Sequence, residues 1–308
     1  MKSFKVDINT NQAEEILKGK FGEPITDLSP IEMGELSKVF SFRVKYKPYV
    51  VHFRKSRESL DKAHYMYKLY GDKLPIPPVF MSGESNEVFF NISNKVEGRP
   101  VSSYSVPEQK IILDDLAKHF TNMSQIILDP SEGFGLISPE GTAYSKSWGE
   151  VIAGFFKEDL EGFYKDWTKL YKESFLEKSL FEEGYSAMME LIKYSPNVPH
   201  LVHGDFHLGN VLSDGKQVTG IVDWELSMYG DFMFDLAILH LWAPHLEFPQ
   251  KVRNLWLENG SDIVNFNERL RSHMLFKAID GLRFYAKQGT KPAYDFIREK
   301  VVNLIKGL

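Results

Sequence analysis

The first third of the chain has the short-period pattern of β-strands. Residues 40–44 (FSFRV) alternate between buried-type and polar side chains, and residues 49–54 (YVVHFR) are rich in β-branched and aromatic residues. Lys47 and Pro48 separate the two segments, which predicts a β-hairpin. Residues 79–82 and 88–93 predict two further strands.

Two helices and a rigid connector are predicted between these strands. The polar segment 9–20 predicts a short helix with Thr10 or Asn11 as its N-cap, and residues 59–70 predict a second helix. Residues 74–78 (LPIPP) hold three prolines, which a helix interior does not tolerate. We therefore expect an extended connector there.

Beyond residue 93 the hydrophobic period becomes helical. Six helices are predicted, over residues 108–128, 148–171, 177–194, 232–242, 261–287 and 292–306, and short strands and turns interrupt them at 200–223. The fold class predicted is α+β: a small β-rich lobe (1–92), a hinge (93–98) and a larger, mostly helical lobe (99–308). A chain of 308 residues suits two lobes around a cleft.

Composition and charge exclude several classes of protein. The chain has no cysteine, so disulfides, thiolate zinc sites and cysteine nucleophiles are excluded. The N-terminal residues lack the apolar stretch of a secretory signal, and the best apolar run, 236–242, is too short for a membrane span. We expect a cytoplasmic protein without a membrane partner. A net charge of −5 argues against nucleic-acid binding.

The charge is unevenly distributed along the chain. Residues 1–92 carry 14 basic and 12 acidic side chains, and the remainder carries 23 basic and 30 acidic ones. This imbalance is compatible with ordinary solvated surface. It is also the distribution expected if the C-terminal part attracts a cationic substrate.

The strongest chemical motif is HGDFHLGN at residues 203–210, followed by Asp223 thirteen residues after Asn210 and directly behind an apolar run. Its H-x-D-x-x-x-x-N spacing is that of a kinase catalytic loop. Phosphoryl transfer needs a group that orients the acceptor hydroxyl and oxygen ligands that hold Mg²⁺. Asp205 fits the first role, and Asn210 and Asp223 fit the second.

A metal-dependent hydrolase is the alternative interpretation of this motif. His203, Asp205 and His207 could be metal ligands, but the sequence offers no further histidine cluster, and His200 and His240 are poorly spaced for it. The combination of the loop, the hairpin and Asp223 favours a kinase.

The stretch HGDFHLGNVL…GIVDWE…YGDFMFDLA resembles the aminoglycoside phosphotransferase family, whose fold is protein-kinase-like. Segments 37–42, 74–77 and 202–203 resemble its hygromycin B phosphotransferase branch, and the resemblance runs from about residue 28 to 287. It implies an ATP- or GTP-dependent kinase with catalytic Asp205 and Mg²⁺ on Asn210 and Asp223. It also implies that His203 and Asp235 brace the catalytic loop. An isolated carboxylate in an apolar run, such as Asp235, is expected to satisfy buried backbone donors.

The match in the β-rich lobe is looser. By the resemblance, residues 33–37, including Ser37, cover the phosphates, and Ile92 and Ser93 belong to the hinge that reads adenine through backbone groups. The third-strand lysine of kinases is absent. Its place falls at His52, and Arg54 faces the same side of the strand. Either could bind the phosphates, with Asp61 or Glu58 as the partner on the helix.

The acceptor is predicted to be a small molecule. Only eleven residues separate Asp223 from Asp235, which leaves no room for a segment that docks a peptide. Glu225, Asp280 and Trp242 are candidates to bind the acceptor, although each alone could equally be a core or surface residue.

Three functions remain open on the sequence. The first is antibiotic resistance through phosphorylation of an aminoglycoside or aminocyclitol, and the second is a metabolic kinase of a choline-like amine, a sugar or a macrolide. The third is a nucleotide-binding protein with little catalysis, suggested by the missing lysine and opposed by Asp205, Asn210 and Asp223. We expect a monomer.

Overall fold

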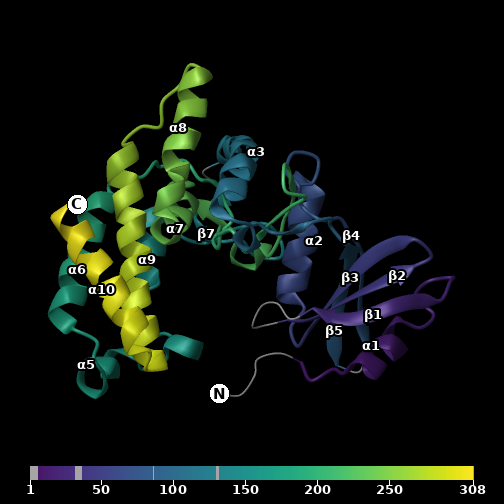
Figure 1. The fold of residues 1–308 in the computed structure, drawn as a ribbon. Helices are drawn as coiled ribbons and strands as arrows, with labels where there is room; N and C mark the ends of the chain where they lie inside the picture. The colour runs from purple at the N-terminus through teal and green to yellow at the C-terminus, as the bar shows by residue number, and fades with distance from the viewer. Residues whose placement is uncertain (1–5, 32–36, 86, 130–131, 308) are drawn as a thin grey trace. The chain divides into compact units, whose positions relative to one another are not determined.

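The computed structural model describes residues 6–31, 37–85, 87–129 and 132–307 (Figure 1). Packing divides the chain into two compact units, each described here by itself. Unit 1 comprises Met1–Ile112, Ser138–Gly141 and Gly209–Glu225, and unit 2 comprises Leu113–Ile137, Thr142–Leu208 and Leu226–Leu308. The segment 209–225 therefore packs with the N-terminal residues. The lobe boundaries at residues 92 and 98 stay a prediction.

Unit 1 is built on a five-stranded antiparallel sheet. Its strands are β1 (Ile25–Ile31), β2 (Lys38–Val44), β3 (Lys47–Arg54), β4 (Val79–Ser85) and β5 (Val88–Asn94), in the order β1-β2-β3-β5-β4. The hairpin of β2 and β3 is confirmed. Its turn consists of Lys45 and Tyr46, because Val44 pairs with Lys47, so the expectation that Lys47 and Pro48 form the turn is wrong. Lys45 has a φ of 54°, as two-residue hairpin turns require.

Strand β1 was not predicted from the sequence. Asp27 and Pro30 interrupt its pattern, and both residue types are rare inside strands. The structure accommodates them because β1 is an edge strand whose register shifts between Thr26 and Ser29, where Asp27 has a φ of 54°.

Helix α1 (Thr10–Leu17) covers one face of the sheet. Its N-cap is Asn9, whose side chain accepts the N–H of Gln12, so the expected caps at Thr10 or Asn11 are wrong: both lie inside the first turn. Buried residues of α1 share a core with the alternate strand residues Val51 and Phe53. That face is the interior that the alternation in β3 predicts.

Helix α2 (Glu58–Tyr70) lies on the opposite face. Asn91 of β5 donates its side-chain amide to the carbonyl of Leu60, at 2.7 Å. His52 pairs directly with Asn91 across the strands, so His52 and Arg54 lie on the face toward α2. The sequence prediction that these two residues share a face is confirmed.

A second sheet completes unit 1. It joins β6 (Arg99–Pro100), β9 (Val211–Ser213) and β10 (Val218–Ile221) in the order β10-β9-β6. Strands β9 and β10 form a hairpin, as expected for short strands within residues 200–223. The hairpin brings the segment after the HGDFHLGN motif beside the chain that leaves the first sheet.

Unit 2 is largely helical. Its helices are α4 (Trp148–Gly154), α5 (Leu170–Glu173), α6 (Lys178–Ile192), α7 (Met233–Trp242), α8 (Phe248–Glu258), α9 (Phe266–Gln288) and α10 (Lys291–Lys306), with α3 (Val106–Ser124) leading in from unit 1. A small sheet joins β7 (Gly135–Leu136), β11 (Met228–Gly230) and β8 (His200–Val202). The α+β class is therefore observed.

The helices of unit 2 differ from the prediction in two places. The helix expected over 148–171 ends at Gly154, and the left-handed φ angles of Gly162 and Asp166, of 66° and 57°, interrupt helical structure in the rest of that segment. Helix α8 was missed, although Pro249 at its start is a usual first-turn residue. Its residues precede the 261–287 segment, where α9 begins only at Phe266.

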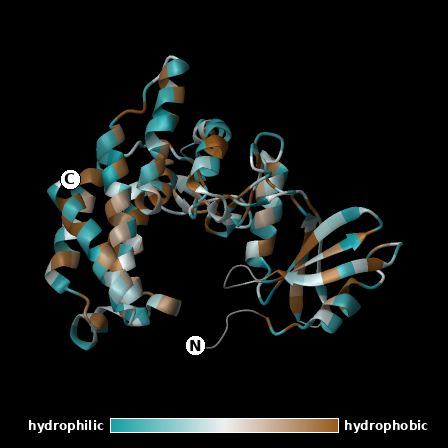
Figure 2. Ribbon diagram, viewed as in Figure 1, coloured by the Kyte–Doolittle hydropathy of each residue, from teal (hydrophilic) through white to brown (hydrophobic). Residues whose placement is uncertain are grey.

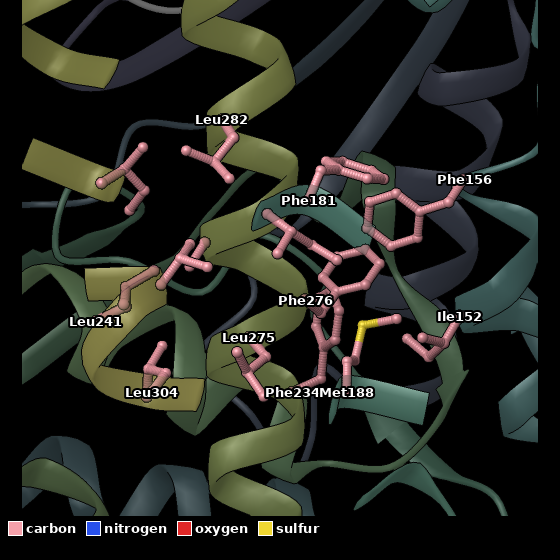
Figure 3. Packing of buried hydrophobic residues seen from close by; sticks show 14 of the residues in the cluster. Ile152, Phe156, Phe181, Met188, Phe234, Leu241, Leu275, Phe276, Leu282 and Leu304 are labelled. Carbon is pink, nitrogen blue, oxygen red and sulfur yellow. The ribbon is translucent and has the colours of Figure 1, made fainter. Parts of the chain in front are cut away.

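The core of unit 2 is aromatic and aliphatic. Figure 3 shows Phe156, Phe181 and Phe276 gathered beside Met188, and the ring centroids of Phe156 and Phe276 lie 5.2 Å apart in an edge-on arrangement. In Figure 2 the long helices of this unit carry both hydrophobic and hydrophilic residues, as helices with one buried side do. Among the residues that the structure describes, no helix is long and apolar enough to cross a membrane.

Candidate active site

The loop that carries Asp205 is tied to the start of α7. Strand β8 ends at Val202, and the next two backbone N–H groups, of His203 and Gly204, donate to the two carboxylate oxygens of Asp235 at 2.7 and 2.9 Å. Asp235 is fully buried. Burial raises the pKa of Asp235 to about 7, against the lowering effect of these two hydrogen bonds. The carboxylate therefore fixes where the loop begins.

His203 shapes the next step of the loop. It is completely buried, and its Nδ1 accepts the backbone N–H of Asp205 at 3.3 Å. An accepting Nδ1 places the ring proton of the neutral imidazole on Nε2. Between these residues Gly204 has a φ of 84°, and a β-carbon there would lie 2.0 Å from the carbonyl oxygen of Leu226. Only glycine fits this position.

The Asp205 side chain is about one-third exposed, so a substrate can reach it. Its Oδ2 lies 3.4 Å from Nε2 of His207. Burial alone would raise the pKa of Asp205, but the hydrogen bond from His207 and the positive charge of Lys277 outweigh it and lower the pKa. Asp205 is thus ionised at neutral pH and can accept a proton. Lys277 of α9 was not predicted, because it lies far from the motif in sequence.

A buried ion pair anchors the segment that precedes α7. Arg269 of α9 donates to both oxygens of Asp231, at 2.6 and 3.0 Å. Burial opposes ionisation of Asp231, but the Arg269 guanidinium outweighs it and lowers the pKa of the carboxyl. The preceding Gly230 packs against Trp148, whose ring would lie 2.2 Å from a β-carbon there. These contacts fix the strand β11 and the helix that carries Asp235.

Within unit 1, Asn210 and Asp223 lie at the same end of the β9–β10 hairpin. Asn210 directly precedes β9, and the backbone N–H of Val222 donates to the Asn210 carbonyl at 2.9 Å. Asp223 follows with a left-handed φ of 65°, which asparagine and aspartate tolerate better than most residues. An amide oxygen and a carboxylate at one hairpin end are suitable donors for Mg²⁺, which takes one or two protein ligands beside phosphates.

Arg54 is engaged by two partners on the α2 side of the sheet. Its Nε donates to Oγ of Ser37 at 2.6 Å, and its Nη1 lies 2.7 Å from Oε2 of Glu225. The side chain of Arg54 is only 14% exposed. The observed partner of Arg54 is Glu225 rather than the expected Asp61, which pairs with Arg57, the residue directly before α2.

His52 is not a permanent cation. Burial and the neighbouring Arg54 lower its pKa to about 4, so the imidazole is neutral at physiological pH. Of the two candidates for the missing third-strand lysine, Arg54 is the charged one.

Lys62 of α2 was missed by the sequence analysis. It is 5% exposed, and its Nζ donates to the backbone carbonyl of Glu225 at 2.8 Å. Burial lowers the pKa of Lys62, which the charges of Glu58 and Glu225 partly offset. The sequence did contain an indication that Lys62 is buried. It precedes the buried Met66 and Tyr70 by four and eight residues, so it lies on the apolar side of the helix.

The remaining candidates have partners of their own. Asp280 binds the buried Arg283 at 3.0 Å, and the half-exposed Trp242 stacks on Phe296 with ring centroids 6.5 Å apart. Ile92 is fully buried. Ser93 pairs with Val50 and Val79 within the sheet. Residues 33–36 of the expected phosphate-covering loop lie outside the described residues.

The hydrolase alternative relied on a set of metal-binding histidines. His200 is committed elsewhere, since its Nδ1 lies 2.7 Å from the carbonyl oxygen of Ser124. Across the described part of the chain, no three His, Asp or Glu side chains are grouped so that they could hold a metal ion.

The fold and the motif residues define a kinase-like phosphotransferase, and comparison with known families agrees. The chain belongs to the phosphotransferase enzyme family (APH), which matches residues 27–260. It is therefore a phosphotransferase of the small-molecule kinase class.

The chain is also similar to individual proteins along most of its length. Hygromycin-B 4-O-kinase of Escherichia coli is 26% identical over 90% of this chain and 80% of its own length. The crystal structure of a thermostable mutant of aminoglycoside phosphotransferase APH(4)-Ia, in ternary complex with AMP-PNP and hygromycin B, has a TM-score of 0.79 at 25% identity and covers 96% of this chain and 98% of that one. Acyl-CoA dehydrogenase family member 11 of Pongo abelii is 24% identical over 84% of this chain but only 33% of its own length.

Proposed function

We propose that this protein transfers the γ-phosphoryl group of ATP or GTP to a hydroxyl of a small cationic molecule such as an aminoglycoside or aminocyclitol. The similarity to a kinase of hygromycin B supports the acceptor class. The similarity to a structure that holds AMP-PNP and hygromycin B supports the nucleotide. The acidic balance of the residues beyond 92 would favour a cationic acceptor.

The observation that carries the proposal is the placement of Asn210 and Asp223 at one end of the β9–β10 hairpin. The Val222–Asn210 backbone hydrogen bond and the left-handed conformation of Asp223 fix the backbone of both residues at that end, just outside strands β9 and β10. Residues 209–225 are packed into the unit that contains the five-stranded sheet, which is the predicted nucleotide-binding part. This is a donor set suited to a metal–nucleotide complex.

Asp205 is the proposed catalytic residue. The acceptor hydroxyl oxygen attacks the γ-phosphorus, the bond from phosphorus to the bridging oxygen of the nucleotide breaks, and the hydroxyl proton passes to the Asp205 carboxylate. The nucleoside diphosphate leaves. An Asp205 that is ionised and one-third exposed is suited to receive that proton.

His203 and Asp235 hold the loop on which Asp205 lies, through the backbone contacts of that loop. Asn210 and Asp223 would bind Mg²⁺, and a bound Mg²⁺ neutralises the charge that develops on the phosphate oxygens. Phosphoryl transfer by positioning and electrostatic stabilisation does not require a covalent intermediate between the phosphoryl group and the protein.

Trp242 and Asp280 remain proposed contacts of the acceptor. Trp242 presents a half-exposed ring, which could stack on a sugar or an alkylammonium group. Asp280 is partly neutralised by Arg283, so it would serve as a hydrogen-bond acceptor as much as a counter-ion. The Glu225 carboxylate is held by Arg54 and is a weaker candidate for the acceptor.

An acceptor panel tests the proposal. The protein is incubated with MgATP or MgGTP and, in turn, hygromycin B, other aminoglycosides, spectinomycin, choline, a macrolide and simple sugars, and release of the nucleoside diphosphate is followed. We expect acceptor-dependent release with an aminoglycoside or aminocyclitol. Release only with choline, a macrolide or a simple sugar would support the metabolic alternative. Nucleotide binding without release for any acceptor would support the weakly catalytic alternative.

A further inference from the structure

Glu225 is held at both of its polar ends by cations from two different elements. Arg54 of β3 binds its carboxylate at 2.7 Å, and Lys62 of α2 binds its backbone carbonyl at 2.8 Å. Glu225 follows Asp223, the proposed metal ligand, by two residues. Arg54 and Lys62 therefore bind the short segment that contains Asp223.

The two cations are themselves fixed. Arg54 lies in a strand paired on both sides and gives its Nε to the buried Ser37 hydroxyl at 2.6 Å. Lys62 lies on a helix that Asn91 ties to β5 through the Leu60 carbonyl. Because neither cation is on a mobile surface side chain, each can define the position of the group that it binds.

A lysine is almost never this deeply buried unless its ammonium group is paired. Removing an ammonium group from water is costly, and lysine is among the side chains least often found inside proteins. Replacement by an apolar residue of similar volume would fit the stripe formed with Met66 and Tyr70. The use of a charged group at this position therefore points to what its ammonium binds, the carbonyl of Glu225.

The segment between the hairpin and Glu225 is short and constrained. The N–H of Val222 is bound to Asn210, and Trp224 donates its indole N–H to the Ile221 carbonyl at 2.9 Å. Asp223 lies between these contacts and the two cations, in a left-handed conformation that must be imposed by its surroundings. Release of Glu225 would remove the constraint that these two cations place on the C-terminal side of Asp223.

We infer that Arg54 and Lys62 are positioning residues that hold Asp223 in its metal-binding orientation by fixing Glu225. The inference rests on the proposed function. In protein kinases the third strand supplies a lysine and the following helix supplies its glutamate partner. Here the helix supplies the lysine, the strand supplies an arginine, and the acid follows the metal-binding aspartate.

A different role for the same cations gives a different result. If Arg54 or Lys62 bound the nucleotide phosphates directly, its loss would weaken nucleotide binding whether or not Mg²⁺ is present. If they act through Asp223, only the binding that depends on Mg²⁺ is affected. Removal of Mg²⁺ therefore separates the two roles.

The test measures the affinity for AMP-PNP by isothermal titration calorimetry, once with MgCl₂ and once with EDTA. The variants are Arg54→Met and Lys62→Met. The matched controls are Arg43→Met, an exposed arginine of β2, and Lys68→Met, an exposed lysine of α2. We expect Arg54→Met and Lys62→Met to weaken binding by roughly 10–100-fold in MgCl₂. In EDTA they should match the wild-type protein, and the controls should match it in both buffers.

Circular dichroism at the titration temperature confirms that each variant is folded. Should Lys62→Met not fold, Glu225→Gln provides the test, because it weakens the contact with Arg54 and leaves the backbone carbonyl to Lys62. It should show the same Mg²⁺-specific loss. Equal losses in both buffers, or no loss in folded variants, would overturn the inference. A wild-type protein that does not bind AMP-PNP in MgCl₂ would instead overturn the proposed function on which it rests.

Discussion

The α-carbon of Gly204 lies so close to Leu226 that a β-carbon added at Gly204 would be 2.0 Å from the Leu226 carbonyl oxygen. Gly204 also has a φ of 84°, which side-chain-bearing residues rarely adopt. The residue before Asp205 is thus fixed by a steric limit and by the Asp235 carboxylate together.

Gly204→Ala should therefore lower the free energy of unfolding by about 3 kcal/mol or more, since the clash with backbone adds to the strain of positive φ. Gly260→Ala is the matched control: Gly260 has a φ of 80° but no atom within 4 Å of the added β-carbon. It should cost about 1 kcal/mol. Urea denaturation of both variants checks this, and equal losses would show that the contact with Leu226 is unimportant.

The buried ion pair of Asp231 and Arg269 should be essential for stability. Asp231→Asn leaves a guanidinium that is 5% exposed without its counter-charge, which should lower the free energy of unfolding by about 3–5 kcal/mol. Asp262→Asn removes a similarly bidentate partner from Arg253 at an exposed site and should cost less than about 1 kcal/mol. Chemical denaturation that gives similar values for both variants would contradict the role assigned to burial.

His52 should make the protein less stable as the pH falls below neutrality. Its pKa is about 4 in the folded chain, against 6.5 for an exposed histidine, so the unfolded chain binds the proton first. Stability is fully present above about pH 6.5 and falls as the pH drops from there toward 4, by on the order of 2–3 kcal/mol. His52→Gln should remove this contribution. Urea titrations at several pH values would contradict the account if wild-type and variant proteins lost stability in parallel.

The same shift bears on nucleotide binding. Since His52 stays neutral down to about pH 4, nucleotide affinity should not rise as the pH falls from 8 to 6. A rise over that range that His52→Lys abolishes would show that the protonated imidazole contributes charge to nucleotide binding.

Asp223→Ala should abolish the Mg²⁺ dependence of nucleotide binding, because it removes the proposed carboxylate ligand at the hairpin end. Affinity for AMP-PNP in MgCl₂ should fall to the level found in EDTA. Asp72→Ala, at an exposed position of the same unit, should bind as the wild-type protein does. Calorimetric titration in the two buffers decides, and a variant that retains tighter binding in MgCl₂ would exclude Asp223 as the ligand.

Much of the fold could be predicted because its signals are local. The hairpin of β2 and β3 was predicted from the alternation of apolar and polar residues. The catalytic loop at 203–210 was predicted from the spacing of its histidine, aspartate and asparagine. Both patterns involve residues close in sequence. Strand β1 was missed because edge pairing tolerates Asp27 and Pro30, which local propensity disfavours. Thr10 and Asn11 were wrongly expected to cap α1 because Asn9 offers the same chemistry one or two residues earlier.

The environment of the site residues could not be predicted in the same way. Lys62 and Glu225 lie 163 residues apart in sequence, and nothing near either residue indicates the other. The neutral state of His52 follows from desolvation and the neighbouring Arg54, which lower its pKa, and the local sequence does not show the desolvation. Such contacts are set by tertiary packing, and sequence patterns report on them only through weak signs such as a lysine in an apolar stripe.

The central claim, that Asp205 promotes phosphoryl transfer to a small acceptor, is tested most directly by mass spectrometry of hygromycin B after incubation with MgATP and either wild-type protein or Asp205→Asn. The account predicts that the wild-type protein adds one phosphoryl group to the acceptor. The variant should do so at least about 100-fold more slowly while binding AMP-PNP as tightly as the wild-type protein. Phosphorylation by Asp205→Asn at the wild-type rate would contradict it.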